Sequence, residues 1–95
     1  MSIQIRNLYK SFHDNQVLRN VDLDVKEREI VVLMGLSGSG KTTLLRCLCD
    51  LETADSGEIL INDSYLLKEE NGRSVYADKE TKKALRKEVG MVFQN

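Results

Sequence analysis

Residues 35–42 of the chain are Gly35-Leu36-Ser37-Gly38-Ser39-Gly40-Lys41-Thr42. They match the pattern G-x-x-x-x-G-K-[ST], which requires a buried strand before it and a helix after it. Residues 30–34 are continuously apolar and rich in β-branched side chains, which predicts a strand covered on both faces. Residues 41–51 carry leucines at helical spacing, which predicts the helix. The pattern therefore stands in the context that it needs.

Each residue type in this stretch has a task in holding a chain of phosphates. The glycines let the backbone turn and point its N–H groups inward, and the start of the helix adds its positive dipole end. Lys41 supplies a full charge for the β- and γ-phosphates, and the Thr42 hydroxyl suits a Mg²⁺ shell. A glycine loop that merely packs would explain the glycines but not the Lys-Thr pair. We therefore expect a phosphate site for a nucleoside triphosphate, lined by Gly35, Ser37, Gly38, Ser39, Gly40, Lys41, Thr42 and Thr43.

Composition limits the remaining possibilities. The chain has 95 residues, 41% of them apolar and 31% charged, with a net charge of −1, which fits one small domain without a global positive field for nucleic acid. The longest apolar run, residues 30–34, is far shorter than the roughly 18 residues of a membrane span. Cys47 and Cys49 would lie roughly 200° apart on a helix, so they cannot share a metal ion. We expect a cytoplasmic chain without disulfides.

The flanking sequence predicts the other elements. Apolar residues alternate with polar ones around residues 3–5 and 21–25, which is typical of half-buried strands in an antiparallel region. Further predictions are a short strand over residues 59–61 that runs into a turn at Asn62-Asp63, a surface loop or hairpin at Asn71-Gly72, a helix over about residues 79–88 capped by Asp78, and a strand over residues 89–93. The predicted fold class is α/β, a partial domain like that of P-loop NTPases, with an antiparallel β region at the N-terminus and a Walker A strand-loop-helix.

Six segments, in order, resemble the ATP-binding subunits of ATP-binding cassette (ABC) transporters. They are residues 8–12 with Val17-Leu18, residues 21–25, Glu29, the glycine-rich loop with residues 43–46, residues 56–59 and residues 90–94. Residues 62–87 look most like the polar amino acid importers of that family. The resemblance implies that residues 1–95 are the N-terminal part of one ABC-type ATP-binding domain, ending at the Q-loop.

The resemblance also assigns residues outside the loop. In that family an aromatic residue upstream stacks on adenine, and Phe12 stands at the matching position; the alternatives are that Phe12 is a core residue or that Tyr9 takes its place. Gln94 matches the Q-loop glutamine, which reaches the Mg²⁺, so the expected metal ligands are Thr42 and Gln94. Leu36 and Arg28 depart from the usual proline and glycine, but neither touches the phosphate chemistry.

The signature LSGGQ, the Walker B carboxylates and the switch histidine of that family do not occur in residues 1–95. We therefore expect a fragment whose C-terminal half is missing, which binds ATP with Mg²⁺ without hydrolysing it alone. The implied parent is a transport ATPase that couples ATP hydrolysis to import of a polar amino acid. It would lie at the inner face of the cell membrane with a second ATP-binding subunit and transmembrane permease subunits. The alternatives are a non-catalytic ATP-binding or interaction module, a non-functional remnant, and another phosphate-loop enzyme such as a small-molecule kinase.

Overall fold

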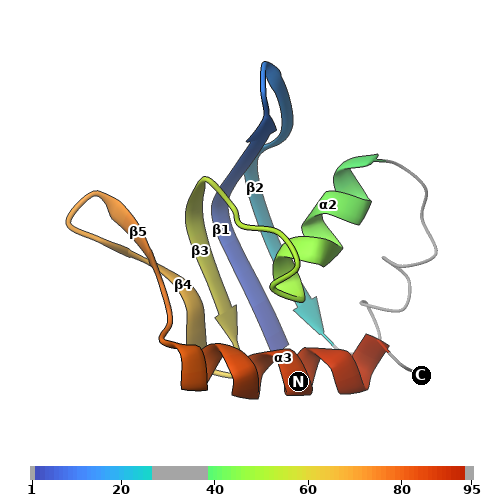
Figure 1. Ribbon diagram of the computed structural model, residues 1–95, viewed down its shortest axis with the longest axis vertical. Coiled ribbons are helices and arrows are strands. Elements are labelled where there is room, and N and C mark those ends of the chain that lie inside the picture. Colours follow the sequence, from blue (N-terminus) through green and yellow to red (C-terminus); the bar gives the residue numbers. More distant parts are fainter. Residues whose placement is uncertain (1, 27–38, 94–95) are drawn as a thin grey trace.

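A computed structural model describes residues 2–26 and 39–93 (Figure 1). These residues form an antiparallel sheet of five strands, in the spatial order β2-β1-β3-β4-β5, with two helices. The elements are β1 (Ser2–Phe12), β2 (Asn15–Lys26), α2 (Ser39–Leu48), β3 (Ser56–Ile61), β4 (Ser64–Glu70), β5 (Arg73–Tyr76) and α3 (Lys79–Phe93). The predicted antiparallel region and the mixture of helix and strand are confirmed. The predicted strand over residues 30–34 and the loop over residues 35–38 lie outside the described residues.

Strand β1 shows why alternation in sequence becomes a buried face. Ile3 and Ile5 are completely buried and pair with β2 on one side and β3 on the other. A bulge follows at Asn7, whose φ of 51° lies in the left-handed region, and the register shifts so that Leu8 is the next buried residue. Asparagine tolerates this conformation better than most residues with a side chain. The bulge therefore keeps the apolar face of the strand turned to the core.

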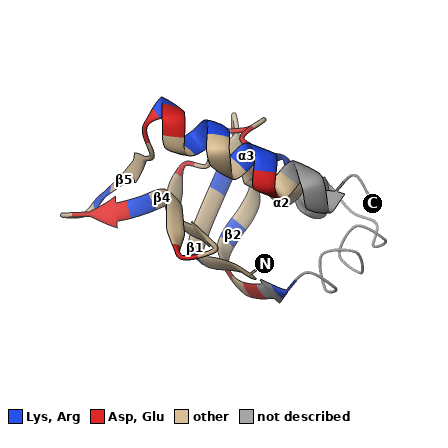
Figure 2. Cartoon of the chain, turned by 90° about the horizontal axis from the view of Figure 1, so that it is seen from below, with Lys and Arg blue, Asp and Glu red and all other residues tan. Residues whose placement is uncertain are grey.

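Both helices lie on one face of the sheet, as the view from below shows (Figure 2). Helix α2 buries Leu44, Cys47 and Leu48 in the core cluster, and the sheet contributes residues such as Ile59 and Ile61. The helix was predicted over residues 41–51, but it ends at Leu48 and leaves Leu51 64% exposed. Asp50, with a φ of 58°, is in the left-handed conformation that commonly terminates helices. Within the described residues, neither helix combines the length and the apolar character needed to cross a membrane.

Helix α3 corrects one prediction. Asp78 caps it as expected, because the Thr81 amide donates a 2.8 Å hydrogen bond to Asp78 Oδ1. The predicted strand over residues 89–93 is wrong, because the helix continues to Phe93. Leu85 and Val89 are four residues apart, so a continuous helix places both on one side, and both are buried in the core. Helix α3 is therefore longer than the predicted helix over residues 79–88, and Val89 adds an apolar position to its buried side.

Two predicted turns are confirmed, and one close approach is new. The backbone of Asn62-Asp63 and of Asn71-Gly72 has positive φ throughout, as tight hairpin turns require. Gly57 in β3 has a φ of +121°, and a Cβ built there would lie 2.6 Å from the Asn7 carbonyl oxygen. Only glycine therefore allows β3 to approach the bulge in β1.

Candidate phosphate and base site

The predicted phosphate-binding residues lie at the start of α2, as far as the structure describes them. Ser39 and Gly40 begin the helix, and the backbone of Lys41 and Thr42 continues it. Thr43 is 8% exposed and faces the protein interior. The helix therefore begins within the glycine-rich motif. The remaining residues of the predicted site, Gly35, Ser37, Gly38 and Gln94, lie outside the described residues.

The first turn of α2 suits an anion. It contains no acidic residue, so the positive end of the helix dipole is not offset by a carboxylate within that turn. Helix α3 differs, because Asp78 accepts from its first turn and Glu80 lies within that turn. The residue types at the start of α2, a lysine and neighbouring hydroxyls, fit a magnesium-bound triphosphate, since Mg²⁺ takes hard oxygen ligands.

Phe12 ends strand β1 beside the β1–β2 turn. The residue is 37% exposed and is not part of the buried core, which contradicts the alternative of a core residue. The Lys10 ammonium lies 5.0 Å from the centroid of the Phe12 ring, within range of a cation–π contact. In Figure 1 the β1–β2 turn and the first turn of α2 both lie toward the upper end of the molecule. The fold therefore turns the predicted base platform and the predicted phosphate helix toward one end.

A charged cluster that sequence reasoning missed lies beneath Phe12. Lys10 Nζ is 3.7 Å from Glu52 Oε1 and 3.7 Å from Asp55 Oδ1, and its side chain is only 12% exposed. Asp55 also accepts a 2.7 Å hydrogen bond from the Ser11 amide. These contacts join β1 to the connection between α2 and β3. They were not predictable because the partners are more than 40 positions apart and no motif marks them.

A second cluster holds the C-terminal end of α2. Asp50 Oδ1 is 3.5 Å from Lys82 Nζ, and Asp50 Oδ2 is 4.0 Å from Arg86 Nε, so α3 is joined to the end of α2. The Tyr76 hydroxyl accepts a 2.7 Å hydrogen bond from the Ala54 amide. Burial raises the pKa of Tyr76 to about 12, so the phenol remains protonated at neutral pH. The connection between α2 and β3 is therefore held at Asp50 by α3 and at Ala54 by Tyr76.

The two cysteines are free thiols, in agreement with the predicted absence of disulfides. Cys47 is completely buried, and burial raises the pKa of its thiol to about 11. Burial also raises the pKa of the half-buried Cys49. Neither has the lowered pKa of a reactive cysteine, so Cys47 acts as a small apolar residue of the core.

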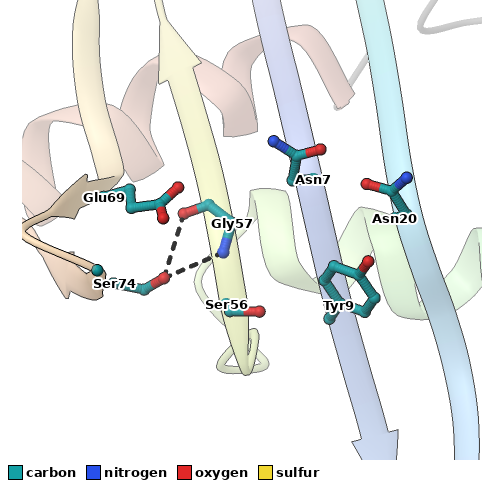
Figure 3. Close-up of a pocket in the computed structure, with 8 residues that line it drawn as sticks. Asn7, Tyr9, Asn20, Ser56, Gly57, Glu69 and Ser74 are labelled. Carbon is teal, nitrogen blue, oxygen red and sulfur yellow. Dashed lines mark hydrogen bonds between the residues drawn. The ribbon is translucent and has the colours of Figure 1, made fainter.

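A pocket of about 280 Å³ lies on the face of the sheet that points away from the helices (Figure 3). The side chains of Asn7, Asn20 and Tyr9 stand along one side of it and those of Glu69 and Ser74 along the other (Figure 3). Its lining contains no lysine or arginine and includes one carboxylate. This charge pattern opposes a triphosphate. The pocket therefore does not compete with the start of α2 as a phosphate site.

Comparison with known proteins gives the family of the chain. Residues 18–95 match the family model described as ABC transporter, so the chain belongs to that family. The chain is 44% identical over 94 residues to the L-cystine transport system ATP-binding protein TcyN of Escherichia coli. The aligned region covers 99% of this chain and 36% of TcyN.

Two further relatives have comparable identities. The methionine import ATP-binding protein MetN of Clostridium acetobutylicum is 45% identical over 93 residues, covering 98% of this chain and 27% of that protein. The glutamine transport ATP-binding protein GlnQ of E. coli is 41% identical over 92 residues, covering 97% of this chain and 35% of that protein. The chain thus spans between 27% and 36% of the length of these three relatives.

Proposed function

We propose that residues 1–95 form the ATP-cradling N-terminal part of the ATP-binding domain of an ABC importer, ending at the Q-loop. The observation that carries this proposal is that helix α2 begins inside the glycine-rich motif and has no carboxylate in its first turn. The family match over residues 18–95 supports it. A different phosphate-loop enzyme is disfavoured, because the flanking segments match this family as well as the motif does.

In this proposal the phosphates bind main-chain N–H groups over residues 35–42, and Lys41 neutralises the β- and γ-phosphates. Thr42 and Gln94 hold the Mg²⁺, which supplies charge neutralisation to the phosphate oxygens. Adenine stacks on Phe12, whose ring is exposed enough to accept a flat base.

The relatives support a proposal for the solute, and the family supports one for the partners. The names of the three relatives specify cystine, methionine and glutamine, so we propose an amino acid as the solute of the whole transporter. The resemblance of residues 62–87 to polar amino acid importers supports a polar one. A second ATP-binding subunit and transmembrane permease subunits would complete that transporter at the inner face of the membrane. The sequence of residues 1–95 contains neither the signature motif nor the Walker B motif, so we expect these residues alone to bind ATP without turnover.

Thermal unfolding with and without Mg-ATP tests the proposed site. At an ATP concentration of 100 times Kd, binding adds about 2.7 kcal/mol, which raises the Tm of a domain of this size by about 10–20 °C. We expect Lys41→Ala to lose most of this increase. Lys83→Ala is the matched control, because Lys83 is an exposed lysine of α3 outside the predicted site. An equal ATP response in the Lys41→Ala variant would contradict the proposal.

A further inference from the structure

We propose that Lys10 is a positioning residue for the base end of the nucleotide site. Its ammonium holds the Phe12 ring in place before nucleotide binds, and its carboxylate partners tie that ring to helix α2. This inference rests on the proposed function, because it assumes that Phe12 receives the base and that α2 receives the phosphates.

The contact between Lys10 and Phe12 leaves the ring available. The ammonium lies 5.0 Å from the ring centroid, and the Lys10 side chain is only 12% exposed, so the cation is held within the protein surface. Phe12 as a residue is 37% exposed, which leaves area for a flat base. A ring that is already oriented loses less conformational freedom when a base stacks on it.

The ammonium itself is fixed by its other partners. Glu52 and Asp55 each place a carboxylate oxygen 3.7 Å from Lys10 Nζ. Asp55 is anchored to the same strand in two more places, because it accepts from the Ser11 amide at 2.7 Å and its own amide donates to the Tyr9 carbonyl oxygen at 2.8 Å. The end of β1 that carries Phe12 is therefore attached at several points to the connection after α2.

The carboxylate of Glu52 also contacts α2. Glu52 Oε2 is 3.8 Å from Arg46 Nε, and the Glu52 amide donates to the Arg46 carbonyl oxygen at 3.2 Å. Arg46 lies on α2, five positions after Lys41, which corresponds to about 7.5 Å of helix rise. A continuous series of contacts therefore runs from the Phe12 ring through Lys10 and Glu52 to the helix that begins at the motif. Lys10 thereby helps to set the distance between the base platform and the phosphate helix.

The chain contains a natural control for this arrangement. Lys68 Nζ lies 5.4 Å from the Tyr65 ring centroid and 4.0 Å from Glu70 Oε1, so it also combines a ring and a carboxylate. Its side chain is 50% exposed and its partners all belong to β4, so none of these contacts reaches α2. Removing the charge of Lys68 therefore tests whether the loss of any such lysine contact changes nucleotide binding.

The test compares a ligand that has a base with one that has none. Dissociation constants for Mg-ATP and for magnesium tripolyphosphate are measured by calorimetry with the full chain, unsubstituted and as Lys10→Met, Lys68→Met and Phe12→Ala. We expect Lys10→Met to weaken ATP binding about two- to five-fold, as for an exposed or partly desolvated cation–π contact, and to leave tripolyphosphate binding unchanged. Lys10→Arg should restore ATP binding, and Lys68→Met should change neither ligand.

The outcomes separate this inference from the proposed function. If the unsubstituted chain binds neither ligand, the proposed function is wrong and the inference falls with it. If the unsubstituted chain binds ATP, two results would show that Lys10 does not position the base platform. Either Lys10→Met weakens the binding of ATP and of tripolyphosphate equally, or it changes the binding of neither. An unchanged ratio of the dissociation constants for ATP and tripolyphosphate in Phe12→Ala would also overturn the inference. Should Lys10→Met not fold, Glu52→Gln decides, because it removes one of the two carboxylate partners of Lys10 and the link to Arg46 while Lys10 keeps its charge. An unchanged ratio of the dissociation constants for ATP and tripolyphosphate in that variant would overturn the proposal.

Discussion

Replacing Gly57 by alanine provides a sharp test of how the sheet is assembled. Gly57 has a φ of +121°, which side-chain-bearing residues rarely adopt. A Cβ at this position would lie 2.6 Å from the Asn7 carbonyl oxygen, 2.7 Å from the Leu8 Cα and 2.9 Å from the Arg6 carbonyl oxygen. All three are backbone atoms, so no flexible side chain can move aside. Strands β1 and β3 would have to separate at the bulge.

Two costs add up. Holding alanine in such a backbone conformation costs about 1–3 kcal/mol, and forcing an extra methyl group into a packed site costs about 1–3 kcal/mol. The expected loss for Gly57→Ala is therefore about 2–6 kcal/mol. A chain of this size has a free energy of unfolding of about 5–14 kcal/mol, from about 0.05–0.15 kcal/mol per residue. The substitution would remove a large part of this stability.

Gly72→Ala is the matched control, and urea unfolding followed by circular dichroism is the assay. Gly72 also has positive φ, at +80°, but a Cβ there meets nothing within 4 Å. It carries the conformational cost alone, about 1–2 kcal/mol. We expect the urea midpoint of Gly57→Ala to fall by about 1 M or more, since the slope for small proteins is about 1–3 kcal/mol per M, and to lie clearly below that of Gly72→Ala. Equal midpoints for the two variants would refute the close approach of β3 to β1.

Three further predictions concern single polar groups. A hydrogen bond from the Thr81 amide in the first turn of α3 lowers the pKa of Asp78 below 3.8. Asp78→Ala should therefore lower the urea midpoint at pH 7. The difference in midpoint from the unsubstituted chain should vanish as the pH falls through the lowered pKa. Tyr76→Phe leaves the buried Ala54 amide without its acceptor and should cost about 1–3 kcal/mol, whereas Tyr65→Phe, at an exposed ring, should leave the midpoint unchanged. The thiol of Cys47 ionises at about pH 9 in the unfolded chain, whereas burial raises its pKa in the folded chain to about 11. The free energy of unfolding should therefore fall as the pH rises from about 9 to about 11. Cys47→Ala should flatten that fall in urea midpoints taken at pH 8, 9.5 and 10.5.

The parts of the fold that were predictable are those specified by local signals. Alternation around Ile3 and Ile5 predicts half-buried strands, and the Asn71-Gly72 pair predicts a hairpin, because in both cases neighbouring residues determine the backbone. Asp78 marked the start of α3 for the same reason, since its cap reaches only three residues along the chain. Phe12 and the start of α2 were placed by the motif and by the resemblance, and their roles in binding remain predictions.

The rest depends on contacts between distant segments. Residues 89–93 have an apolar, β-branched composition that fits a strand, and the burial of Val89 beside Leu85 against the sheet favours a helix. The requirement for glycine at position 57 comes from a bulge about 50 positions earlier in the chain. Lys10 and its carboxylate partners are ordinary surface residue types in the sequence, and only the docking of the connection after α2 onto β1 brings them together.

The β4–β5 hairpin offers a practical handle on the molecule. Figure 1 shows its tip projecting away from the rest of the sheet, on the side opposite α2. Asn71 and Gly72 at this tip are exposed, and space is open around Gly72. Short polar tips of this kind accept inserted residues readily. An affinity tag or a fluorophore introduced between these two residues would report on the chain without touching the segments proposed to bind nucleotide.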